Sequence, residues 1–117
     1  MVARLSTHVL DTVRGRAAAG IRIDLYRIAE ERELVVSVTT NADGRTGEPL
    51  LSGDPLPGGV YELVFHTADY FRVNGTPLAD PPFLDLVTIR FGIDPSAGSY
   101  HVPLLLAPYG YSTYRGT

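Results

Sequence analysis

Short segments in which apolar and polar residues alternate, separated by glycine and proline, constrain the fold of this chain more than any other feature. The clearest is IRIDLYRIA, residues 21–29. Three apolar side chains fall on one face of it, and Arg22, Asp24 and Tyr26 fall on the other. A repeat of two residues is typical of a β-strand with one buried face. We therefore predict a half-buried strand here.

Six further segments are rich in β-branched and apolar residues and lie between turn signals. They are residues 4–12, 34–40, 60–68, 84–93, 99–107 and 109–115. Connections rich in glycine, proline or Asp-Gly steps are expected at residues 13–20, 41–50, 56–59 and 76–82.

One short helix is expected near residues 68–74, because an Asn-Gly step follows it. Seven or eight strands at this spacing, with no alternation of strands and helices, predict an all-β fold. We expect an antiparallel β-sandwich of two sheets.

Composition narrows the range of functions. A chain of 117 residues that is 44% apolar can form one domain, residues 1–117, with a real core. It has no cysteine, which excludes thiol catalysis, and no lysine, which excludes Schiff-base chemistry.

A net charge of −3 without a basic run argues against a nucleic-acid partner. No apolar stretch approaches the roughly 18 residues that span a membrane, and no signal peptide is evident, so we expect a cytoplasmic protein.

Two of the histidines in predicted strands are candidate site residues. His8 shares a face with Ser6 and Leu10, and alternation alone favours a surface histidine there. His101 is followed two residues later by Pro103, which has no N–H for a sheet hydrogen bond and places the strand at an edge or a bulge. The local pattern leaves His101 equally open as a rim residue or a site residue.

Two further residues have ordinary local interpretations. Arg45, in the turn NADGRT, is by itself best interpreted as a solvated arginine. His66 is expected to be structural or exposed, without a paired partner. The three histidines lack metal-ligand spacing, so we expect no metal site.

Three stretches taken together resemble the transthyretin-like family, in particular its hydrolase branch. They are LSTHVLDTVRGRAAAG near the start, TTNADGRT in the middle and HVPLLLAPYGYSTYRGT at the end. The resemblance covers essentially the whole chain. The tail is its most specific part, because the hydrolases end on Tyr-Arg-Gly-Ser and the hormone carriers of the family lack that ending.

The resemblance implies a transthyretin-like β-sandwich that assembles into a homotetramer with active sites between facing subunits. It implies cofactor-free hydrolysis of 5-hydroxyisourate, a small-molecule substrate from urate degradation. The family's catalytic positions fall on His8, Arg45 and His101. Its substrate-binding tail falls on Tyr114, Arg115, Gly116 and Thr117.

Two departures from the family pattern stand out. Thr117 replaces the usual terminal serine, which keeps the hydroxyl but adds a methyl group. Ala17 replaces a usual proline in the first connection, and the effect should be mild. Two alternatives stay open: a small-ligand carrier without hydrolase activity, and a structural sandwich module. A carrier has no need of two histidines, an arginine and this tail, and a structural module is normally one unit of a longer chain.

Overall fold

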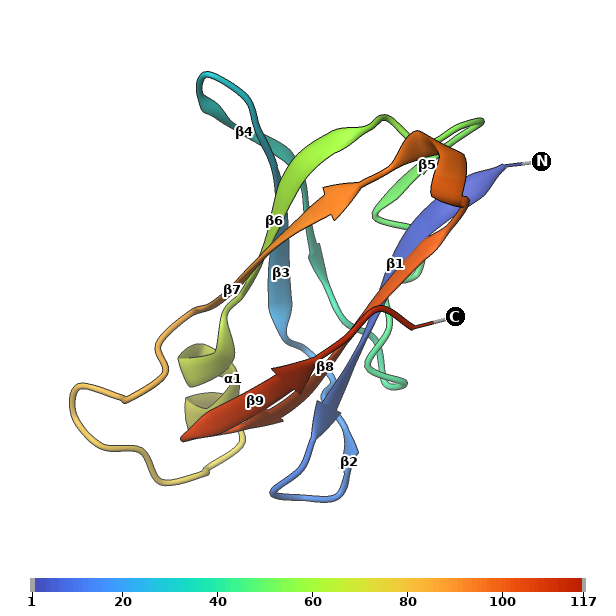
Figure 1. Ribbon diagram of the computed structural model, residues 1–117. Coiled ribbons are helices and arrows are strands. Elements are labelled where there is room, and N and C mark those ends of the chain that lie inside the picture. Colours follow the sequence, from blue (N-terminus) through green and yellow to red (C-terminus); the bar gives the residue numbers. More distant parts are fainter. Residues whose placement is uncertain (1, 117) are drawn as a thin grey trace.

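Two β-sheets packed face to face form the computed structural model, which describes residues 2–116 (Figure 1). Sheet A has the order β2–β1–β8–β9, with β5 also paired to β1, and sheet B has the order β4–β3–β6–β7. The strands of sheet A are β1 (Ala3–Asp11), β2 (Arg16–Ala17), β5 (Leu51–Gly53), β8 (Tyr100–Ala107) and β9 (Gly110–Thr113). Those of sheet B are β3 (Arg22–Ile28), β4 (Arg32–Thr39), β6 (Gly59–Phe65) and β7 (Val87–Ile93).

The predicted β-sandwich is confirmed, and each predicted segment contains a strand. The helix expected near residues 68–74 is α1 (Thr67–Val73), followed by the cap Asn74, and a single 3₁₀ turn spans Pro95–Ala97. Sequence reasoning missed β2 and β5, which are two and three residues long and lie in or beside predicted connections. In residues 2–116 no helix has the length and apolar character needed to cross a membrane.

One strand pair departs from the expected antiparallel arrangement. β1 and β8 run parallel, whereas the other strand pairs among the described residues are antiparallel. Adjacent strands joined by a tight turn must be antiparallel, but a long connection permits either direction. Most of the chain lies between β1 and β8, so their direction cannot be read from a local pattern.

The core lies between the inner faces of the two sheets. Alternation places every second side chain of β1 inward, and this buries Leu5, Thr7 and Val9 while Ser6 and His8 stay half-buried on the outer face. The Thr7 hydroxyl donates to the Val102 carbonyl oxygen at 2.7 Å, which satisfies its buried polar group. Further side chains without exposed surface are Ile21, Ile23, Leu25, Leu63, Phe65, Leu104 and Leu106.

Asp24 breaks the predicted alternation in β3, because it is buried and not solvent-exposed. Its carboxylate accepts hydrogen bonds from the Ser37 hydroxyl at 2.5 Å, His66 Nε2 at 2.8 Å and Arg22 Nε at 3.1 Å. Burial by itself would raise the pKa of Asp24, but these donors outweigh it and lower the pKa. The expectation that His66 lacks a paired partner is therefore wrong, although its role is structural: it joins the start of α1 to β3.

A second buried carboxylate ties α1 to sheet A. The Tyr70 hydroxyl donates to Asp11 Oδ2 at 2.7 Å, while the backbone N–H groups of Val13 and Arg14 donate to Asp11 Oδ1 at 3.0 Å each. Both Asp11 and Tyr70 are buried. Burial, followed by the hydrogen bond and negative charge of Asp11, raises the pKa of Tyr70 to about 12. The phenol is consequently neutral and remains a donor.

We predict that Tyr70→Phe lowers the free energy of unfolding by about 1–3 kcal/mol, because it removes one donor from a buried carboxylate. Denaturant unfolding of the wild type and the variant measures the difference. Tyr109→Phe is the matched control, since Tyr109 is 65% exposed. Equal destabilisation by the two substitutions would contradict the anchoring role of Tyr70.

Candidate active site

A polar cavity of about 420 Å³ lies on sheet A where β1, β8 and the C-terminal residues meet. Two of the predicted catalytic residues, Arg45 and His101, line it, and so does Gly116 of the predicted tail. The lining residues are Arg4, Ser6, Arg45, Ser99, Tyr100, His101 and Gly116. Residues from four distant parts of the sequence therefore share one cavity.

The parallel register of β1 and β8 creates this meeting. Ser6 stands opposite His101, and His8 stands opposite Pro103. Paired residues in adjacent strands direct their side chains to the same face of a sheet. Ser6, His8 and His101 consequently share the outer face of sheet A, the face predicted from alternation for His8.

Arg45 reaches this face through a turn that is docked on β1. The Asn41 side-chain oxygen accepts from the backbone N–H groups of Asp43 and Arg45, at 2.9 and 3.2 Å. Gly44 has a φ of +72°, and a Cβ there would collide with the carbonyl oxygen of Val9. The Asn-x-Asp-Gly pattern is thus needed for a tight turn that packs against a strand.

His8 and Arg45 face each other in a backbone bridge between β1 and this turn. His8 Nε2 lies 2.9 Å from the Asp43 carbonyl oxygen. A carbonyl can only accept, so Nε2 carries the proton and donates it. Whenever the His8 ring is in its uncharged form, its lone pair is therefore on Nδ1.

His101 is half-buried and hydrogen-bonds through Nδ1 to the Ser6 hydroxyl oxygen at 2.8 Å. Burial, then the charges of Arg45 and His8, lowers the pKa of His101 below 6.5. A neutral imidazole that shares a cavity with a guanidinium can accept a proton while the cation stabilises negative charge. This pair of groups suits the hydrolysis of an acyl bond.

The sequence predicts an edge or a bulge at Pro103. The strand β8 as a whole lies between β1 and β9, but at Pro103 itself it is paired with β1 alone. The proline nevertheless marks a break in the sheet. The β8–β9 ladder ends at the Leu104–Thr113 pair and resumes at a single bridge between His101 and Gly116. Pro103 lies in the gap and has no N–H to donate, so it interrupts pairing right beside the site.

The predicted tail residues separate onto two faces of sheet A. Gly116 N–H donates to the His101 carbonyl oxygen at 2.7 Å and so lies at the cavity. Arg115 lies over the Tyr100 ring at 4.1 Å and donates to the carbonyl oxygens of Ala97 and Ser99, away from the histidines. Tyr114 is 61% exposed, and Thr117 lies outside the described residues.

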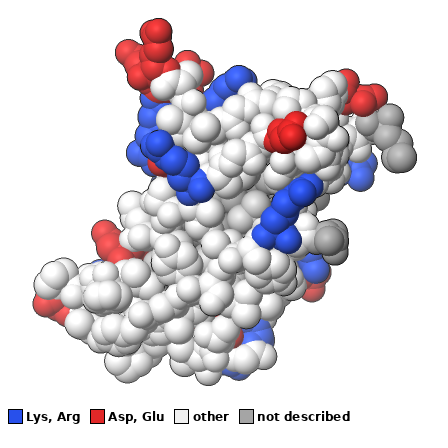
Figure 2. Space-filling model, in the orientation of Figure 1, with Lys and Arg blue, Asp and Glu red and all other residues white. Residues whose placement is uncertain are grey.

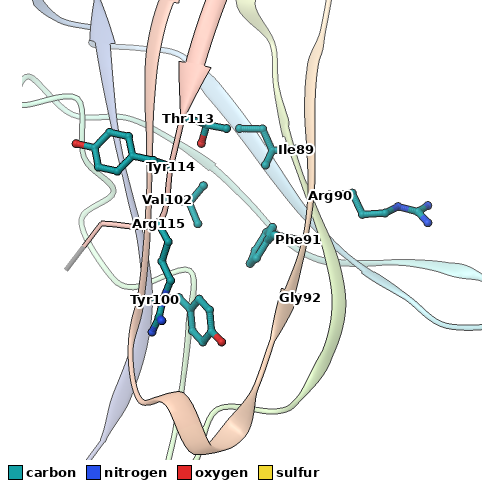
Figure 3. A pocket seen from close by; sticks show the side chains of 9 residues that line it. All are labelled: Ile89, Arg90, Phe91, Gly92, Tyr100, Val102, Thr113, Tyr114 and Arg115. Carbon is teal, nitrogen blue, oxygen red and sulfur yellow. The ribbon is translucent and has the colours of Figure 1, made fainter.

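A second cavity, of about 290 Å³, opens between the edges of the two sheets (Figure 3). Figure 3 shows the Arg115 side chain alongside Tyr100 and the Tyr114 ring turned to the other side of the strand. Its lining includes Ile89, Phe91 and Val102 and no histidine. Of these two cavities, the polar one is the candidate active site, because it contains an imidazole together with a predicted catalytic arginine.

Sequence reasoning missed Arg4, Ser6, Ser99 and Tyr100 as cavity residues. Alternation did indicate that Ser6 shares a face with His8, but the partner strand of β1 was not predictable from sequence. Within residues 2–116 no group of three or more histidine, cysteine or acidic residues is arranged to hold a metal ion.

Comparisons with known sequences agree on one family. The HIUase/Transthyretin family model matches residues 5–116. A protein of Rhizobium meliloti named 5-hydroxyisourate hydrolase 2 is 58% identical over 115 residues, which are 97% of this chain and 96% of the relative. The 5-hydroxyisourate hydrolase of Deinococcus radiodurans is 53% identical over 97% of this chain and 95% of its own length.

Solved structures give the same answer. An (S)-allantoin synthase matches 99% of this chain with a TM-score of 0.92 and 44% identity, and the match spans 44% of that longer chain. Klebsiella pneumoniae 5-hydroxyisourate hydrolase matches 98% of this chain and 99% of its own, with a TM-score of 0.77 and 34% identity. Sea bream transthyretin in complex with thyroxine matches 97% of this chain and 95% of its own, with a TM-score of 0.84 and 25% identity. Together with the family model, these likenesses establish that the chain belongs to the HIUase/Transthyretin family.

Proposed function

We propose that this chain, as a single transthyretin-like domain of residues 1–117, hydrolyses 5-hydroxyisourate to 2-oxo-4-hydroxy-4-carboxy-5-ureidoimidazoline in urate degradation. Relatives that are 58% and 53% identical carry the name of this activity. The observation that carries the proposal for this chain is the presence of Arg45 and His101 in one polar cavity, with His8 bridged to Arg45 on the same face of sheet A. These residue types supply proton transfer and charge stabilisation without a cofactor.

His101 acts as the general base in this mechanism. Its lowered pKa keeps the imidazole neutral at physiological pH. It takes a proton from a water molecule, and the water oxygen adds to the ring carbonyl carbon that is bonded to nitrogen. The carbon–nitrogen bond then breaks, and the proton passes from His101 to the departing nitrogen. This opens the ring to a ureido group and a carboxylic acid, which releases its remaining proton to water.

Arg45 stabilises the negative charge that develops on the carbonyl oxygen, since its planar guanidinium offers several donors in a fixed geometry. His8 orients the water or the substrate. Its Nε2 is occupied by the Asp43 carbonyl oxygen, which holds the ring in place and leaves Nδ1 for the site.

The tail completes a site that is shared between subunits. Gly116, at the cavity, and Thr117 contact substrate, while Tyr114 contributes its exposed ring when a second subunit faces it. Arg115 supports the same tail through its contacts with Tyr100, Ala97 and Ser99. The assembly is a homotetramer in the cytoplasm.

An exposed apolar area supports assembly. Figure 2 shows a broad uncharged surface over β9 and the loop that precedes β7. Phe83 and Tyr109 stack there with their ring centroids 5.9 Å apart, and both are mostly exposed. A large exposed apolar patch on a small domain commonly marks an interface.

A small-ligand carrier is the alternative function, because the fold is shared with a transthyretin that is seen in complex with thyroxine. The polar cavity that contains Arg45 and His101 favours a hydrolase over a ligand carrier. A carrier of an apolar ligand has no use for a neutral histidine beside a cation, whereas bond hydrolysis requires both groups.

We predict that sub-stoichiometric protein accelerates the decay of 5-hydroxyisourate produced from urate by urate oxidase, followed by ultraviolet absorbance. His101→Asn should lower turnover by about 10²–10⁴-fold, because it removes the general base. Arg45→Ala should lower it by about 10²–10³-fold, because it removes a donor to the oxyanion. Arg72→Ala, an exposed arginine of α1, is the control and should retain full turnover.

Two outcomes would count against this assignment. An unchanged decay rate with folded wild-type protein would favour the carrier. Near-native turnover in either site variant would remove that residue from the mechanism. The oligomeric state of each variant should be measured alongside, so that a loss of assembly is not mistaken for a loss of chemistry.

We predict a pKa below 6.5 for His101 in the wild type and a higher value in Arg45→Ala. Burial, Arg45 and His8 all disfavour the protonated ring, and removing the cation lifts part of that effect. NMR titration of the imidazole carbons measures both values, with Arg72→Ala as the control that leaves the pKa unchanged. An equal pKa in the wild type and in Arg45→Ala would contradict the electrostatic coupling.

We predict that light scattering across a dilution series gives a mass four times that of the 12.7 kDa chain. A mass of one or two chains at the concentrations used for the activity assay would show that the tetramer is not required.

A further inference from the structure

The His101 ring is held on two opposite edges. On one edge, Nδ1 lies 2.8 Å from the Ser6 hydroxyl oxygen. On the other, Gly116 lies so close that a Cβ built on it would be 2.8 Å from His101 Cδ2 and 3.4 Å from His101 Cγ. That separation is shorter than real Cβ contacts allow, so only glycine fits against the ring as it stands.

The two occupied edges determine where the rest of the ring points. In imidazole, Nδ1 and Cδ2 are the two atoms bonded to Cγ, so Nε2 and Cε1 are the atoms farthest from the backbone. Among residues 2–116, Nε2 of His101 has no hydrogen-bond partner. Ser6, Gly116 and His101 all line the same cavity. Nε2 is therefore the nitrogen that remains available to a bound molecule.

We propose that Ser6 is a positioning residue for His101: its hydroxyl oxygen accepts the Nδ1–H, which leaves the lone pair on Nε2 in the cavity, while Gly116 provides the space that this ring orientation needs. The expected loss of kcat rests on the proposed hydrolase function. The expected protonation of His101 Nδ1 does not depend on that function. It assigns Ser6 a role that neither its alternation pattern nor its residue type indicates.

The strand register explains why a short hydroxyl side chain can do this. Ser6 and His101 are directly paired across β1 and β8, which brings their Cβ atoms close together. The partner of one ring nitrogen determines which nitrogen carries the proton in neutral histidine. With alanine at position 6, no side chain would hold the proton on Nδ1, and the ring would also lose one of its two lateral contacts.

The test compares Ser6→Ala, Ser6→Thr and Ser52→Ala. Ser52 is exposed on β5 in the same sheet, outside the cavity, so its substitution controls for loss of a hydroxyl from sheet A. Ser6→Ala should lower kcat by about 10- to 100-fold with a smaller effect on KM, because the base is misoriented and not removed. Ser6→Thr should restore most of the turnover, and Ser52→Ala should match the wild type.

A spectroscopic readout makes the test independent of activity. Nitrogen-15 NMR of histidine-labelled protein, with His101 assigned by comparison with His101→Asn, reports which ring nitrogen is protonated. The wild type should show the Nδ1–H form at neutral pH, and Ser6→Ala should lose it. If the wild type does not accelerate substrate decay, the proposed function fails, and the nitrogen shifts alone decide the role of Ser6.

Gly116→Ala provides a second route if Ser6→Ala folds poorly. Its added methyl group must displace the ring of His101, so it should also lower kcat and alter the His101 nitrogen shifts. Gly92→Ala is the matched control, because a Cβ there meets no atom within 4 Å and Gly92 lies on β7 in the other sheet. Unchanged kcat and unchanged nitrogen shifts in Ser6→Ala, or in Gly116→Ala, would overturn the proposal.

Discussion

The parallel pairing of β1 with β8 is the constraint on which the rest of this protein depends. It joins the beginning of the chain to a strand near its end and places Ser6 beside His101 and His8 beside Pro103. Because both strands alternate, one register decides which side chains enter the core and which share the outer face. A slip of β1 by one residue would turn Ser6 and His8 inward and Leu5 and Val9 outward, so burial of the core also maintains the site.

Two buried carboxylates secure the elements around that pairing. Asp11 closes the turn after β1 and holds α1 through Tyr70, and Asp24 holds the start of α1 through His66. Each carboxylate has several donors, which is the condition under which a buried charge is tolerated. The short helix is thereby attached to both sheets, although it is only seven residues long. Polar groups inside the sandwich thus specify how its parts are joined.

The candidate site forms because the fold brings together residues that are distant in the sequence. Each of these residues has an ordinary local environment. His8 bonds to a turn carbonyl, Arg45 extends from a turn, and His101 bonds to a serine. Together they give a neutral imidazole near a cation in a cavity, a combination that none of them shows alone. Pro103 contributes indirectly: its missing N–H interrupts the β8–β9 ladder, and the tail re-enters the sheet only at Gly116.

The sequence by itself determined the strands, the short helix, the faces of β1 and the tight turn before Arg45, because alternation, capping and glycine requirements act over a few residues. Through its resemblance to a family it also indicated His8, Arg45 and His101. Tertiary structure decided the parallel direction of β1 and β8, the burial of Asp24 against His66, and the roles of Ser6 and Gly116 beside His101. These depend on contacts between residues as much as 95 positions apart, and no local pattern encodes the register that brings such residues together.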